Sequence, residues 1–225
     1  MLPNRTEPYR AATRGSGQLP NPDNSQPKPA MQPHSPTRPA VFLDRDGVLN
    51  RAIIRAGKPY PPQSLAEFKI VEGAQEACTR LRDAGFLLIV FTNQPDVARG
   101  QQTKETIEQF HAALRRQLPI DDILTCFHDD VDHCQCRKPK PGLILDARAR
   151  WPIDLDASYV IGDRWRDIGA GCAAGCKTVF LDYDYDEPKP AADVVAQSLS
   201  GATDWILTHS HHNMEARLED PLACS

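Results

Sequence analysis

Residues 86–91 constrain the fold most, because six consecutive apolar side chains leave this strand-length segment without a polar face. A strand buried on both faces is typical of a parallel sheet with helices packed on each side. Apolar runs at 41–43, 159–161 and 178–181 have the same character, and segments with helical spacing of apolar residues separate them. The alternation predicts an α/β fold with a doubly wound, Rossmann-like parallel sheet.

The remaining elements follow from apolar spacing and from capping residues. Gly85 is placed to end a helix, because glycine readily adopts the left-handed conformation that follows many helices. Thr103 is a suitable N-cap, since its hydroxyl can accept a backbone N–H. We expect helices at 72–84, 103–117, 141–150 and 168–175, a short strand at 121–127, and a last strand and helix within 192–207.

Proline content separates a tail from the globular part of the chain. Nine of the 20 prolines fall within residues 1–39, among polar residues that cannot bury enough apolar surface to offset chain entropy. We expect a disordered tail at 1–39, one globular domain at 40–207 and a frayed tail at 208–225. A proline-rich ligand for a partner is the alternative for the first segment. No second block is large enough for a separate cap domain.

Net charge and cysteine content limit the compartments and the partners that suit this protein. The net charge of -4 gives no broad attraction to nucleic acid, and no apolar run is long enough for a transmembrane helix. No apolar stretch of a secretory signal follows the basic residues near the N-terminus. Seven cysteines, three of them crowded beside a histidine, favour reduced thiols and a metal over disulfides. We expect a cytoplasmic monomer with a small-molecule substrate and no nucleic-acid or membrane partner.

Polar side chains follow three of the expected strands, at the edge where a doubly wound sheet binds ligands. One acidic turn after a strand is common and needs no function. Several such ends, with a lysine between them, indicate a site for Mg²⁺ and a phosphate group, because Mg²⁺ prefers oxygen ligands and leaves positions for phosphate and water. The residues concerned are Asp44, Asp46, Thr92, Asn93, Lys138, Asp163 and Asp167.

A group of cysteines and a histidine forms a second constellation, directly before Arg137 and Lys138. A Cys-x-His pair and a Cys-x-Cys pair, five residues apart, supply four ligands suited to a closed tetrahedral zinc site. Such an ion has no open position for a substrate, so we expect it to fix the loop that carries Lys138. Reduced cysteines without a metal are the alternative. The expected ligands are Cys126, His128, Cys134 and Cys136, with His133 as a weaker substitute for His128.

The proline-rich loop at 51–63 leaves the end of the first expected strand and carries Arg55, Lys58 and Tyr60. A loop in that position is well placed to hold a substrate. The alternative is a surface loop that its prolines stiffen and that contacts no ligand.

Four segments resemble, in the right order, the motifs of the haloacid-dehalogenase-like (HAD) phosphohydrolases. Residues 44–50 (Asp-Arg-Asp-Gly-Val-Leu-Asn) are similar to the first motif and residues 91–94 (Phe-Thr-Asn-Gln) to the second. Lys138 matches the third motif, and residues 162–167 (Gly-Asp-Arg-Trp-Arg-Asp) match the fourth. The resemblance covers residues 40–184, nearly all of the globular part.

This resemblance implies a phosphomonoesterase that works through an aspartyl-phosphate. Asp44 would be the nucleophile and Asp46 the general acid and base. Mg²⁺ would be bound by Asp44, by the backbone carbonyl of Asp46 and by Asp163. Thr92 and Lys138 would bind the phosphoryl oxygens.

Other residues are expected to contact the substrate or to support the site. Asp167 would orient Lys138 or a metal-bound water, with a place in the first turn of its helix as the alternative. The expected substrate contacts are Asn93, Arg55, Arg137 and Arg164.

The zinc loop and the following residues 137–142 (Arg-Lys-Pro-Lys-Pro-Gly) resemble the capless branch with heptose 1,7-bisphosphate 7-phosphatases and histidinol-phosphate phosphatases. Residues 137–142 and 98–100 favour the heptose group, whereas the five-residue gap of the zinc loop favours the histidinol group. The long loop at 51–63, Pro95 and Arg164 depart from the heptose group where substrate would be touched. We expect the heptose activity, with the histidinol activity and a non-catalytic binding protein on the same fold as alternatives.

Overall fold

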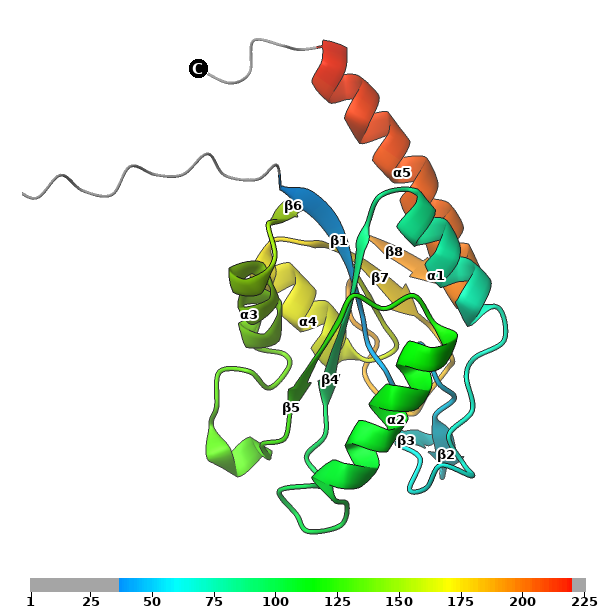
Figure 1. Ribbon diagram of the computed structural model, residues 1–225, viewed down its shortest axis with the longest axis vertical. Helices are drawn as coiled ribbons and strands as arrows, with labels where there is room; N and C mark the ends of the chain where they lie inside the picture. The colour runs from blue at the N-terminus through cyan, green and yellow to red at the C-terminus, as the bar shows by residue number, and fades with distance from the viewer. Residues whose placement is uncertain (1–36, 220–225) are drawn as a thin grey trace, which may run out of the picture. The chain divides into compact units, whose positions relative to one another are not determined.

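The computed structural model describes residues 37–219, with side chains described through residue 210. Its centre is a six-stranded sheet in the order β5-β4-β1-β6-β7-β8, and every neighbouring pair is parallel (Figure 1). This sheet confirms the doubly wound α/β fold. The strands are β1 (Arg38–Leu43), β4 (Leu87–Asn93), β5 (Asp122–Cys126), β6 (Ile153–Gly162), β7 (Lys177–Leu181) and β8 (Val194–Ala196).

Helices cover both faces of the sheet because its strands are apolar on both sides. Along β1, Val41 and Leu43 pack in a cluster with residues of α1, α2 and α5, whereas Phe42 packs in a cluster with α3 and α4 (Figure 1). Alternate residues of a strand point to opposite faces, so one short strand serves both clusters. The helices are α1 (Ala74–Asp83), α2 (Lys104–Gln117), α3 (Gly142–Arg150), α4 (Trp165–Ala174) and α5 (Leu199–Glu219).

The strand register brings the polar strand ends to one level. Leu43 of β1 pairs with Val90 of β4 on one side and with Ile161 of β6 on the other. The chain order of the sheet reverses beside β1, which makes the carboxyl ends of these strands the expected ligand crevice. Asp44 therefore emerges between the ends of β4 and β6.

Capping residues act as the sequence predicts. The Thr103 hydroxyl accepts the backbone N–H of Thr106 at 3.1 Å and begins α2. Gly85 follows α1 with a φ of 93°, which a residue with a side chain rarely adopts. None of the described helices is both long and apolar enough to cross a membrane.

Several predicted boundaries were wrong, among them the following three. The first strand begins at Arg38, inside the segment predicted as tail, and β6 begins at Ile153 instead of residue 159 because its start pairs with Arg38 and Pro39. Helix α5 continues to Glu219, past the predicted end at residue 207, since residues 208–219 contain neither glycine nor proline to interrupt it.

The loop predicted at 51–63 contains a short antiparallel hairpin of β2 (Ile53–Arg55) and β3 (Lys58–Tyr60). Strands of three residues each are too short to show a period of apolar residues, so the sequence pattern did not reveal them. The predicted tail at 1–39 lies outside the described residues except for its last three. Residues 220–225 also lie outside them.

Candidate active site

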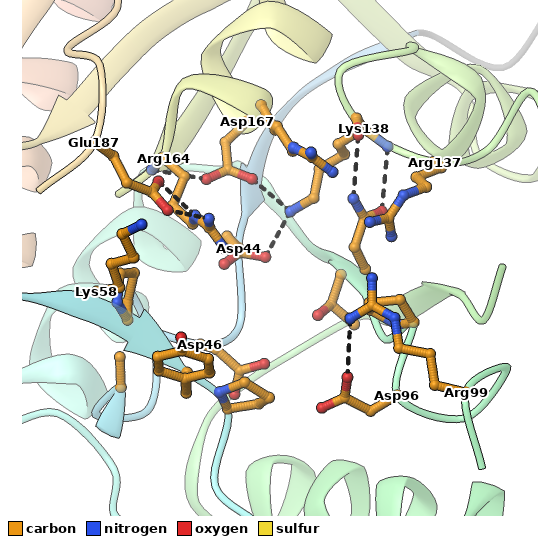
Figure 2. A pocket seen from close by; sticks show the side chains of 18 of the residues that line it. Asp44, Asp46, Lys58, Asp96, Arg99, Arg137, Lys138, Arg164, Asp167 and Glu187 are labelled. Atoms are coloured by element: carbon orange, nitrogen blue, oxygen red, sulfur yellow. Dashed lines mark hydrogen bonds and ion pairs between the residues drawn. The ribbon is translucent and has the colours of Figure 1, made fainter. Parts of the chain in front are cut away.

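A cavity of about 620 Å³ lies where β1, β4 and β6 end (Figure 2). Hairpin β2–β3 forms a second wall, and Glu187 contributes from the segment that follows β7. Asp163 does not line this cavity and is 1% exposed. The predicted site residues that line it are Asp44, Asp46, Arg55, Thr92, Asn93, Arg137, Lys138, Arg164 and Asp167.

Lys138 contacts the residue that follows β1, a residue of β4 and a residue in the first turn of α4. Its ammonium group lies 2.6 Å from Asp44 Oδ1 and 2.6 Å from Asp167 Oδ1, and it donates to the Phe91 carbonyl at 2.9 Å. Burial alone would lower the pKa of Lys138, but the attraction of Asp167 and Asp44 outweighs burial and raises it. Lys138 is therefore a fixed positive charge beside Asp44. Asp167 contacts Lys138 and also caps α4, because its Oδ2 accepts the backbone N–H of Arg164 at 3.0 Å.

Three buried carboxylates form a group with the chemistry of a hard cation site. Oxygens of Asp44, Asp163 and Asp167 lie within 4.8 Å of one another. Burial raises the pKa of Asp44 to about 7, although Lys138 acts in the opposite direction. Burial, followed by the charges of Asp44 and Asp167, raises the pKa of Asp163 well above its usual value.

Asp163 supplies the observation that favours a cation at this place. Both of its carboxylate oxygens are buried without a hydrogen-bond partner of normal geometry among the described residues. The Tyr185 hydroxyl lowers the pKa of Asp163, but burial and the neighbouring carboxylates outweigh it. Such a buried charge is costly unless a cation balances it. A Cβ at Gly47 would lie 1.9 Å from Asp163 Oδ2, so only glycine permits this approach of backbone and carboxylate. The donor set fits Mg²⁺, which prefers carboxylate and carbonyl oxygens.

Asp46 is held by a second set of partners. Arg45, which is 0% exposed, donates to both oxygens of Asp46, from Nε at 3.2 Å and from Nη2 at 2.8 Å. Asn50 donates to Oδ1 at 3.0 Å and Gln94 to Oδ2 at 2.8 Å. Burial alone would raise the pKa of Asp46, but Arg45, Asn50 and Gln94 outweigh it and hold the pKa below its usual value. Sequence reasoning assigned no role to these three donors.

Thr92 and Asn93 end β4 at the cavity. Thr92 is 1% exposed and its hydroxyl accepts the Gln94 amide at 3.0 Å. The side chain of Asn93 bonds the backbone of Lys138 twice: its amide donates to the carbonyl, and its carbonyl accepts the N–H, both at 3.2 Å. The Asn93 side chain thus positions Lys138.

The predicted zinc ligands lie together beside the cavity. Cys126 Sγ is 3.7 Å from both Cys134 Sγ and His128 Nδ1, and Cys136 Sγ is 3.5 Å from Cys134 Sγ. Ligands about 2.3 Å from a tetrahedral zinc ion are separated by roughly 3.8 Å, so this spacing fits such an ion. His133 is not in the group.

Arg137 and Arg164 are both tied to acidic neighbours. Arg137 Nε lies 2.6 Å from Asp130 Oδ1, and its Nη1 donates to the His128 carbonyl at 3.2 Å, which ties it to the cysteine loop. Arg164 pairs with Glu187, with Nε donating to Oε2 at 2.9 Å. No sequence signal links Glu187 to Arg164, because the two residues are 23 positions apart and Glu187 lies in a segment of many acids.

Comparisons with known proteins show which family this chain resembles. The HAD-hydrolase-like family model matches residues 135–202. A D-glycero-beta-D-manno-heptose-1,7-bisphosphate 7-phosphatase of Yersinia pestis is 34% identical over 181 residues, which cover 75% of this chain and 89% of the relative. A relative of the same name in Helicobacter pylori is 33% identical over 176 residues, which cover 76% and 98%.

A solved structure extends the similarity to three dimensions. The D,D-heptose 1,7-bisphosphate phosphatase from B. bronchiseptica, complexed with magnesium and phosphate, superimposes with a TM-score of 0.65 and 28% identity over 76% of this chain and 99% of that chain. Fold and strand-end residues together define a hydrolase of HAD-like type. The chain belongs to the HAD-like phosphatase family that contains these heptose bisphosphate phosphatases.

Proposed function

We propose that this protein is a Mg²⁺-dependent phosphomonoesterase that removes the 7-phosphate from D-glycero-D-manno-heptose 1,7-bisphosphate. The observation that carries the proposal is the buried Asp44, which lies 2.6 Å from the fixed charge of Lys138 and within 4.8 Å of the buried carboxylate of Asp163. The names of the relatives support the substrate. Mg²⁺ would be held by Asp44, Asp163 and the Asp46 carbonyl, and would reduce repulsion between carboxylate and phosphate.

In the first half of the reaction, an Asp44 oxygen attacks phosphorus and the bond from phosphorus to the sugar oxygen breaks. The leaving oxygen takes a proton from Asp46. In the second half, Asp46 takes a proton from water, the water oxygen attacks the aspartyl-phosphate, and phosphate leaves Asp44. The donors around Asp46 favour its anionic form, which suits the second half. Lys138 and Thr92 stabilise the phosphoryl oxygens.

Substrate contacts are assigned to Arg55, Arg137 and Arg164 on the cavity wall, with Asn93 acting through Lys138. We further propose a single phosphatase domain from β1 to α5, a monomeric state and a cytoplasmic location. Neither a nucleic acid nor a membrane is proposed as a partner.

Phosphate release from a panel of esters tests this function. We expect Mg²⁺-dependent hydrolysis of heptose 1,7-bisphosphate at least about tenfold faster in kcat/KM than of histidinol phosphate or hexose bisphosphates. The five-residue gap between His128 and Cys134 makes histidinol phosphate the second candidate. Faster hydrolysis of histidinol phosphate would show that histidinol phosphate, and not the heptose bisphosphate, is the substrate. Absence of Mg²⁺-dependent phosphate release from all esters would refute the phosphatase function.

We also propose that Cys126, His128, Cys134 and Cys136 bind one structural Zn²⁺. The Cys136→Ser variant is expected to lose the bound zinc and about tenfold or more of kcat, because Arg137 and Lys138 follow Cys136 directly. Elemental analysis and phosphate release measure the two effects. The control is Cys172→Ser, which replaces an exposed thiol outside the group. A zinc-free wild-type protein with full activity would contradict the proposal.

A further inference from the structure

The basic side chains that line the cavity differ in their charge balance. Seven of them line it, and two, Arg55 and Lys58, form no ion pair with any side chain in the described part of the chain. Both come from hairpin β2–β3. The other five pair with carboxylates at 4.0 Å or less: Arg99, Arg137, Lys138, Arg164 and Arg166.

The hairpin places its two free charges on one face. Arg55 and Lys58 are direct partners across the antiparallel pair, so their side chains leave the hairpin on the same side, toward the cavity they both line. Like charges at directly opposite positions repel and destabilise a hairpin. An anion between them removes this repulsion. The Tyr60 ring lies under the Arg55 guanidinium at 5.7 Å and limits where that charge can go.

The hairpin is held in a fixed position. Ala56 and Gly57 form its turn with φ values of 47° and 73°, as in the type I′ turn that matches the twist of two short strands. The carbonyl of Gly57 accepts the backbone N–H of Asp186 at 2.9 Å, which ties the turn to the segment after β7. The two cations are therefore presented by a docked element, which favours binding over a solvated surface role.

Lys58 lies to one side of Asp44, the residue at which the reacting phosphate is proposed to lie. Figure 2 shows Lys58 and Arg137 at opposite sides of the cavity, with Asp44 between them. The negative charges near Asp44 already have Lys138 as a partner, and Arg137 has Asp130. A second anionic group on the same substrate would meet the unpaired positive charges of Arg55 and Lys58 at the hairpin. A cavity of about 620 Å³ is in the size range of sites for phosphorylated sugars.

We propose that Arg55 and Lys58 form an anion subsite that receives the second phosphate of a bisphosphorylated substrate, while the first phosphate lies at Asp44. This inference rests on the proposed phosphatase function and names the element that selects a bisphosphate over a monophosphate. The hairpin thus supplies the selectivity that a cap domain would otherwise provide.

Kinetics on a matched pair of substrates test the subsite. We expect Lys58→Gln to lower kcat/KM for heptose 1,7-bisphosphate about 30-fold, mainly through KM, and to change kcat/KM for heptose 7-phosphate less than twofold. Arg55→Gln should act in the same direction, and Lys58→Arg should restore most of the preference. The control is Arg51→Gln, an exposed basic residue of the same loop that does not line the cavity. Equal losses on both substrates, or none on the bisphosphate, would overturn the subsite.

Binding separates this inference from the proposed function. Calorimetry on the Asp44→Asn protein measures the affinities of the two sugars without turnover. If the wild-type protein hydrolysed neither sugar while the Asp44→Asn protein showed a Lys58-dependent preference for the bisphosphate, the subsite would stand and the reaction would be refuted. Full turnover of the bisphosphate by Lys58→Gln would refute the subsite and leave the reaction intact.

Discussion

The Asp44→Asn protein is expected to release phosphate at least about 10³-fold more slowly than the wild type, because the amide cannot form the aspartyl-phosphate. The loss should appear in kcat on every substrate, since the nucleophile acts on the phosphoryl group that all substrates share. Continuous phosphate release at saturating Mg²⁺ measures it. The matched control is Asp96→Asn, which removes a carboxylate on the wall of the same cavity and should change kcat little.

The same substitution should leave the fold intact and raise its stability. Oxygens of Asp44, Asp163 and Asp167 lie within 4.8 Å of one another, with Lys138 as the nearby cation. Asparagine has the shape of aspartate but removes one of these mutually repelling charges, so Tm in metal-free buffer should rise. Thermal unfolding of both proteins checks this result. An inactive variant with a lowered Tm would indicate unfolding instead of a lost nucleophile, and near wild-type activity would contradict the role of Asp44.

For polar residues that directly follow a strand, the sequence predicted that they would meet at one edge of the sheet. The apolar segment at 86–91 has no polar face, so it had to be buried on both sides, and the polar residues next to it had to meet the ends of neighbouring strands. Asp44 and Lys138, 94 positions apart, meet in this way because Leu43 and Val90 are at one level of the sheet. In a parallel sheet, contacts between residues at the strand ends can therefore be predicted from the apolar pattern of the strands.

Contacts that depend on the direction of a side chain could not be predicted. Asn93 was expected to contact the substrate and lines the cavity, but no sequence pattern indicated that its side chain also bonds the backbone of Lys138. Hairpin β2–β3 is too short to show a period of apolar residues. Glu187 comes from a segment that a backbone hydrogen bond from Asp186 ties to Gly57. That three cysteines and His128 lie together was easier to predict, because the four residues fall within 11 positions of the sequence.

Arg45 is the charged residue that the fold buries most completely among those around the cavity. It is 0% exposed, stacks against Phe110 with its Cζ 5.4 Å from the ring centroid, and has His111 Nε2 3.4 Å from Nη1. Burial, followed by the charge of Arg45, lowers the pKa of His111 to about 3, so His111 is neutral at pH 7. Asp46 is therefore the acidic partner that balances the buried charge of Arg45.

The Arg45→Met variant should consequently lose about 3 kcal/mol of unfolding free energy at pH 7, because it leaves Asp46 without its cation in a largely buried place. Urea unfolding measures the loss. The control is Arg80→Met, which breaks the exposed pair of Arg80 with Asp204 at 2.7 Å and should cost less than about 1 kcal/mol.

Activity distinguishes a positioning role of Arg45 from a purely structural one. Arg45 contributes to the lowered pKa of Asp46, so removing it should raise that pKa. Asp46 would then lose its proton at higher pH. The acidic limb of the kcat profile, in which hydrolysis of the aspartyl-phosphate needs Asp46 as a base, should therefore move to higher pH. Arg45→Lys keeps the charge but not the two parallel hydrogen bonds, so its pH profile should lie between those of the wild type and Arg45→Met. Loss of stability with an unshifted profile would restrict Arg45 to the fold, because a base whose pKa is set by Arg45 cannot keep its titration when that charge is removed.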